Sequence, residues 1–152
     1  MRINSNIKYG VWKKMVLYGI TLDYVAVLGA GIASMIAGFI WYGPLFGKLW
    51  MKEMKIDSKN MEGMKKGMST KYALSLAGSL VMAVILGHVL PLMQAITLVA
   101  GLTAGFWMWL GFIAPVQFTE VLFGGKSMKL FALNTGHQLV SVLVMSAVLV
   151  LV

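Results

Sequence analysis

Residues 72–118 read YALSLAGSLVMAVILGHVLPLMQAITLVAGLTAGFWMWLGFIAPVQF and contain no Lys, Arg, Asp or Glu. An apolar run of about 20 residues already crosses a hydrocarbon core of roughly 30 Å as an α-helix. One helix over this whole stretch would be far too long, and Met93 and Gln94 separate it into two runs of suitable length. The stretch therefore predicts two membrane spans, residues 72–92 and 95–118, joined by a tight antiparallel turn.

Two further apolar runs, residues 24–42 and 130–152, have the same length and also lack charged side chains. The whole chain has 152 residues, of which 59% are apolar and 12% charged, so it has too few polar side chains to cover a water-soluble domain of this size. In lipid, a helix satisfies its own backbone hydrogen bonds. The sequence predicts an all-α polytopic integral membrane protein with four antiparallel transmembrane helices.

The lysines indicate how the four spans are oriented. Nine lysines fall in the first and third loops: Lys48, Lys52, Lys55, Lys59, Lys65, Lys66, Lys71, Lys126 and Lys129. The opposite side has four basic residues, all before the first span: Arg2, Lys8, Lys13 and Lys14. Because basic residues are retained inside, we expect an inner cell membrane protein with the first and third loops cytoplasmic and both termini outside. The net charge of +8 then points to anionic lipids at the cytoplasmic face rather than to nucleic acid.

Two segments outside the spans combine basic and apolar residues. Residues 1–23 are interpreted as an N-terminal interfacial segment lying on the membrane, with a disordered leader as the alternative. Residues 43–71 are interpreted as an amphipathic basic loop, because Met54, Met61 and Met68 recur at heptad spacing among lysines. A copper(I) site of thioethers is the less favoured alternative, so we expect no metal and no cofactor.

Small residues at helical spacing indicate close packing. Ala26, Ala30, Ser34 and Gly38 form one stripe on the first span. Gly101 and Gly105 form a Gly-x-x-x-Gly pair in the third. We interpret these positions as helix packing within one bundle, with the seam of a homo-oligomer as the alternative.

The polar residues beside the third loop are the main candidates for a functional site. Gln117, Glu120, Asn134 and His137 lie near the facing ends of the third and fourth spans, where residues equidistant from the turn stand level with one another. An ionisable side chain at membrane depth is a functional hypothesis by default. We therefore expect a ligand or ion pocket between these two helices, in which Glu120 and His137 meet. The alternative is a hydrogen-bonded clamp that only holds the hairpin together.

Aromatic residues divide into two groups. Trp41, Tyr42 and Trp50 follow the first span and are expected to anchor the chain at the membrane interface. Trp107 and Trp109 lie near the middle of the third span, so we expect them to fill the core of the bundle.

A ten-residue block that ends the first span carries a family resemblance. Residues 41–50 read WYGPLFGKLW, in which Trp-Tyr-small-Pro precedes Phe-Gly and a further Trp. Residues 105–112, GFWMWLGF, and 122–126, LFGGK, form a second block. Both blocks resemble a family of small prokaryotic membrane proteins known as domain of unknown function 1761. The resemblance covers residue 24 onwards and implies four spans but no activity; Glu120 and His137 depart from its pattern, where neutral polar or aromatic residues are expected.

These observations favour a small transporter-like or channel-like bundle. The alternative is an accessory protein that binds a partner or anionic lipid through the basic loop of residues 43–71. No hydrolase, phosphate-loop or zinc-protease motif is found, and we assign no catalytic residues. A lipid-modifying enzyme with His137 as general base is the third hypothesis.

Overall fold

The protein is a multi-pass helical bundle, and the computed structural model describes residues 14–17, 20–56 and 67–152. Within these ranges, four helical segments are long and apolar enough to cross a membrane: Tyr24–Leu45, Met68–Leu92, Leu98–Leu122 and Met128–Leu151. Each lies within a few residues of a predicted span. The all-α, four-span prediction is confirmed.

Several of these segments contain more than one element. The first span consists of α1 (Tyr24–Ile40) and a π-helical turn (Trp41–Leu45), followed by the short helix α2 (Gly47–Glu53). The second is α4 (Met68–Leu92). The third consists of α5 (Leu98–Met108), a second π-helical turn (Trp109–Ile113) and α6 (Ala114–Leu122), and the fourth is α7 (Met128–Leu151).

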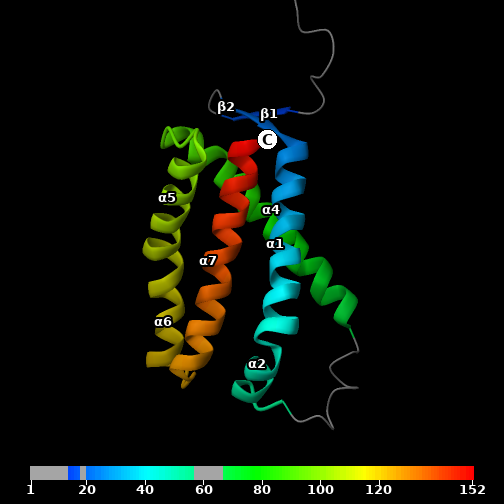
Figure 1. Cartoon of the computed structure of the whole chain (residues 1–152), viewed down its shortest axis with the longest axis vertical. Coiled ribbons are helices and arrows are strands. Elements are labelled where there is room, and N and C mark those ends of the chain that lie inside the picture. The colour runs from blue at the N-terminus through cyan, green and yellow to red at the C-terminus, as the bar shows by residue number, and fades with distance from the viewer. Residues whose placement is uncertain (1–13, 18–19, 57–66) are drawn as a thin grey trace, which may run out of the picture.

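The helix α7 is the centre of the bundle. It packs against α1 and α4 on one side and against α5 and α6 on the other (Figure 1). By contrast, α4 and α5 are consecutive but touch little beyond the turn that joins them. The predicted tight turn is present between Leu92 and Leu98, where Gln94 adopts a positive φ of 56°. Among consecutive spans, the second and third are therefore the pair that packs least.

Small side chains bring these helices together. Ala26, Ala30 and Ser34 are buried on α1, and Ala83 of α4 has no exposed surface. A Cβ added at Gly101 would lie 2.8 Å from Cγ2 of Val150, and one at Gly105 would lie 2.6 Å from Oγ of Ser146. The glycine pair of α5 therefore packs on α7 of the same chain. Without water in the membrane core, this close van der Waals contact is the main attraction between helices.

A β-hairpin covers one end of the bundle, which we call the hairpin end. Strands β1 (Lys14–Leu17) and β2 (Ile20–Asp23) are antiparallel, with Lys14 opposite Asp23. Leu22 is buried against Gly87 of α4, and the Asp23 side chain caps α1 by accepting a 2.8 Å hydrogen bond from the Val25 N–H. This part of the predicted interfacial segment is thus paired backbone; residues 1–13 and 18–19 lie outside the described residues.

The opposite end, which we call the α2 end, holds α2, the start of α4 and the turn between α6 and α7 (Figure 1). Glu53 of α2 accepts a 2.5 Å hydrogen bond from the Ser127 hydroxyl, which also caps α7 through the Leu130 N–H. The predicted amphipathic loop is helical over Gly47–Glu53. Its Met61 and Met64 lie outside the described residues.

The two halves of α4 differ in how they pack. The half near the hairpin end is buried through Ala83, Leu86 and Leu90. The half near the α2 end stands away from the bundle (Figure 1), and the exposed fraction of Leu74 reaches 68%. This divergence opens the space described in the next subsection.

We predict that Gly105→Leu lowers the free energy of unfolding by about 1–3 kcal/mol, because the added side chain would push α5 away from α7. Gly78→Leu is the matched control, since a Cβ there meets no atom within 4 Å. Thermal unfolding of the detergent-solubilised protein, followed by helical circular dichroism, measures both. Equal stability of the two variants would contradict the proposed close contact.

Candidate functional site: a polar cavity between α1, α4 and α7

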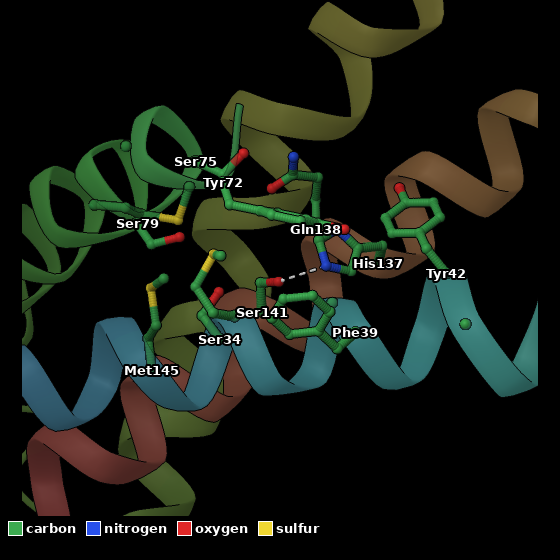
Figure 2. A pocket seen from close by; sticks show the side chains of 15 residues that line it. Ser34, Phe39, Tyr42, Tyr72, Ser75, Ser79, His137, Gln138, Ser141 and Met145 are labelled. Atoms are coloured by element: carbon green, nitrogen blue, oxygen red, sulfur yellow. Dashed lines mark hydrogen bonds between the residues drawn. The ribbon is translucent and has the colours of Figure 1, made fainter. Parts of the chain in front are cut away.

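Four polar residues of α7 share one face because they recur every three or four residues. They are Asn134, His137, Gln138 and Ser141. This face is turned toward α1 and α4. The His137 ring packs on the ring of Tyr42, with centroids 4.8 Å apart, and its Nε2 lies 3.3 Å from the Ser141 hydroxyl (Figure 2).

The position of α7 is held by two tryptophans that donate to its backbone. The indole N–H of Trp41 donates to the Leu133 carbonyl at 3.1 Å. The indole N–H of Trp109, which lies between α5 and α6 on the opposite side of α7, donates to the Thr135 carbonyl at 2.9 Å. The Tyr42 hydroxyl adds a 3.1 Å hydrogen bond to Oδ1 of Asn134. These bonds fix one turn of α7 from two sides.

Both tryptophans begin a π-helical turn, and a proline lies within or just after each turn. Pro44 lies in the first and Pro115 follows the second. Proline lacks the N–H for the usual helical hydrogen bond, and a wider turn accommodates that loss. In the first turn, the Phe46 N–H donates to the carbonyl of Trp41, five residues back. The π-turn carries both Trp41 and Tyr42 into contact with α7.

Two glycines make room for these rings. A Cβ at Gly38 of α1 would lie 3.0 Å from Nε2 of His137, and one at Gly136 would lie 3.2 Å from the Trp41 ring. Gly38 belongs to the small-residue stripe of the first span. Its role in the structure is to admit an imidazole rather than another helix backbone.

A cavity of about 560 Å³ lies between α1, α4 and α7. Eight of the residues that line it are polar: Ser34, Tyr42, Tyr72, Ser75, Ser79, His137, Gln138 and Ser141. The others are Met35, Gly38, Phe39, Gly43, Gly78, Met82 and Met145. Its size is typical of a site for one small molecule. In the described part of the chain no Lys, Arg, Asp or Glu lines it.

The predicted pocket between the third and fourth spans is wrong in its location. Asn134 and His137 face α1 instead of α6. Glu120 forms an ion pair with Lys126 at the α6–α7 turn, and both side chains are about half exposed. Neither Glu120 nor Gln117 lines the cavity, so Glu120 and His137 do not meet. Distance from the turn carried no information about the direction in which α7 turns these side chains.

One expectation about aromatic residues is wrong. Trp107 is 60% exposed and does not fill the core, whereas Trp109 reaches α7. The placement of Trp41, Tyr42 and Trp50 at the membrane interface stays a prediction. The side chains of Trp41 and Tyr42 point into the bundle, and the Trp50 ring packs edge-on against that of Tyr42.

The contribution of α4 to the cavity wall was not predicted from the sequence. Tyr72, Ser75 and Ser79 line one face of the second span at spacings of three and four residues. This polar stripe in an apolar helix was a detectable signal, because hydroxyl groups interrupt an otherwise lipid-compatible surface.

The donor set of the cavity suits uncharged polar groups. Among the described residues, no group of three or more His, Cys, Asp or Glu could hold a metal ion. The second histidine, His88, is buried on α4 near the hairpin end, and its Nδ1 lies 2.8 Å from the Val84 carbonyl of its own helix. The cavity itself offers hydroxyl, amide and imidazole groups, which both donate and accept hydrogen bonds.

We predict that Trp41→Phe and Trp109→Phe each lower the free energy of unfolding by about 1 kcal/mol, the usual worth of one hydrogen bond. Each substitution also removes the five-membered ring of the indole, so lost packing adds to the loss of the hydrogen bond. Trp107→Phe is the matched control because Trp107 faces outward. Denaturation in detergent measures the three variants, and a Trp107→Phe loss as large as the others would argue against the two backbone bonds.

Residues 25–150 match the family described as protein of unknown function (DUF1761). No curated protein and no solved structure matches the chain. The matched region includes the cavity, both π-turns and nearly all of the four spans. Because it covers most of the chain, as the resemblance predicted, this protein belongs to the DUF1761 family.

Proposed function

We propose that this protein is a small transporter-like membrane protein that binds an uncharged solute in the cavity between α1, α4 and α7. The observation that carries the proposal is a charge-free cavity of about 560 Å³ between membrane-spanning helices, with hydroxyl, amide and imidazole groups in a largely apolar wall. Polar groups are costly in this environment unless they are hydrated or have partners. A bound polar molecule, or water that a solute replaces, provides those partners.

A purely structural clamp is the competing explanation. It accounts for Tyr42 and Asn134, which hydrogen-bond each other across α1 and α7. It does not account for Ser75 and Ser79, which line the opposite wall on α4. A site for a ligand accounts for both walls.

Transport also requires a part of the bundle that moves. The α2-end half of α4 is the candidate, because it is exposed while the hairpin-end half is packed in the core. Gly78 lies between these halves, and a Cβ there would meet no atom within 4 Å. Movement of this half toward α1 and α7 would close the cavity.

The chain has no cysteine, so a single introduced thiol reports on access to the cavity. In proteoliposomes we expect Ser79→Cys to react with a membrane-impermeant maleimide added at the α2 end, because polar walls keep the cavity hydrated. Ser69→Cys, exposed at the start of α4, is the positive control. Val81→Cys is the matched negative control, since Val81 is exposed on the same helix but does not line the cavity.

Reaction of Ser79→Cys from the hairpin end as well would support alternating access. Failure to react from either end, while Ser69→Cys reacts, would identify a dry structural contact and contradict the proposal.

A second role is favoured by the charge at the α2 end. The described lysines of the first and third loops are all exposed: Lys48, Lys52, Lys55, Lys71, Lys126 and Lys129. We propose that this end is cytoplasmic and binds anionic lipid headgroups, as basic residues beside a membrane do.

We predict that replacing Lys48, Lys52 and Lys55 together by Gln reduces retention of phosphatidylglycerol over phosphatidylcholine in mixed-lipid nanodiscs. Native mass spectrometry counts the retained lipids. Raising the ionic strength should produce the same reduction in the unaltered protein, because salt screens exposed charges. Retention that is insensitive to both changes would exclude the lysines as a headgroup site.

A further inference from the structure

The polarity of the cavity changes along its length. Near the α2 end its walls carry Tyr42, Tyr72 and Gln138. Nearer the middle of the bundle they carry three methionines together with three small hydroxyl side chains: Met35, Met82, Met145, Ser34, Ser79 and Ser141. Figure 2 shows Tyr42 and Met145 at opposite ends of the group. From Tyr72 to Met82 the helix rises by about 15 Å, at 1.5 Å per residue. The cavity is thus amphipathic, with its polar part toward one membrane surface.

The cavity also opens at its side. Its exposed lining residues belong to α1, the first π-helical turn and α4: Phe39, Gly43, Tyr72, Ser75 and Gly78. Those residues all lie within the first two membrane spans, so an opening between them faces lipid as well as the α2-end surface. The Phe39 and Tyr72 rings meet across the gap, with centroids 5.2 Å apart. A molecule dissolved in the bilayer would reach the cavity when this aromatic pair separates.

We propose that the ligand is an uncharged, single-chain amphipath with a hydroxyl-bearing head, such as a monoacylglycerol, taken from the leaflet at the α2 end. This inference rests on the proposed function and names its substrate class. The head lies among Tyr42, Tyr72 and Gln138, and the chain points toward the methionines. The ligand keeps the orientation of the surrounding lipids, so it moves sideways into the site without turning over.

The charge and size of the cavity select this class. A phosphate or ammonium head would lose its hydration without an opposite charge in return, since none of the described lining residues is charged. Hydroxyl groups, in contrast, pair with the serines, tyrosines and Gln138. A volume of about 560 Å³ suits one compact molecule rather than a two-chain phospholipid. Methionine side chains are flexible and apolar, so they adapt to chains of different shape.

The test uses monooleoylglycerol with a photoactivatable diazirine, in liposomes that contain the full chain. With the diazirine midway along the acyl chain, crosslinks should map to peptides containing Met35, Met82 or Met145. With the diazirine in the head, they should map to those containing Tyr42, Tyr72 or Gln138. The opposite pattern, or labelling spread evenly over the outer helix faces, would overturn the inference.

Gly78→Trp adds a large side chain to the cavity wall at a position where a Cβ meets no atom within 4 Å. It should reduce the crosslinks about tenfold, which corresponds to a loss of roughly 1.4 kcal/mol of binding free energy. Ala77→Trp is the matched control, because Ala77 is the adjacent exposed residue of α4 and does not line the cavity. Ser75→Trp serves in place of Gly78→Trp if that variant fails to fold. Unchanged crosslinking in a folded cavity-filling variant would overturn the inference.

Headgroup selectivity distinguishes a failure of this inference from a failure of the proposed function. Excess unlabelled monooleoylglycerol should compete with the probe and slow maleimide labelling of Ser79→Cys, whereas oleoyl lysophosphatidate should do neither. Suppose that Ser79→Cys reacts with maleimide but monooleoylglycerol changes neither the crosslinking nor the labelling. The proposal of an amphipathic ligand is then wrong, and the proposal of a solute-binding cavity is retained. If Ser79→Cys is also inert and no crosslinks form, both proposals fail. Equal competition by the charged lipid would overturn the neutral-head specificity.

Discussion

The rotation of α7 about its own axis is the constraint on which the rest of the structure depends. Two indole N–H groups hold it: Trp41 donates to the Leu133 carbonyl and Trp109 to the Thr135 carbonyl. Inside a membrane an unpaired donor is costly, so each indole strongly favours the geometry in which it is satisfied. Since the two donors come from opposite neighbours, α7 cannot turn without breaking at least one bond. Its polar face is therefore directed toward α1 and α4.

The π-helical turns are what make this arrangement possible. In each, a proline removes one helical hydrogen bond within or just beyond the turn, and the widened backbone presents a tryptophan to α7. In the first turn the next residue, Tyr42, also reaches α7, where its ring packs at a tilt against that of His137. Gly38 and Gly136 supply the space that the rings need. The same local feature thus both positions the central helix and builds one wall of the cavity.

The cavity exists because α4 follows the bundle for only part of its length. Small and aliphatic residues near the hairpin end pack it tightly, whereas its other half carries Tyr72, Ser75 and Ser79 and stands apart. These residues cannot form a dry, closely packed seam without pairing their hydroxyl groups. A polar ligand supplies such pairing, and the methionines deeper in the cavity supply an apolar end. Both proposals follow from this uneven division of one helix.

Composition and periodicity by themselves determined that the chain crosses a membrane four times, because the free energy of a helix in lipid depends on its own length and side chains. The motif blocks at residues 41–50, 105–112 and 122–126 separately indicated the family. Only the tertiary structure decided that His137 faces Tyr42 and not Glu120, that Trp107 faces outward, and that α4 contributes a cavity wall. Helical periodicity places a residue on a face of its own helix. Which neighbour covers that face depends on crossing angles, glycine contacts and the two indole hydrogen bonds, which involve residues as many as 92 positions apart in the chain.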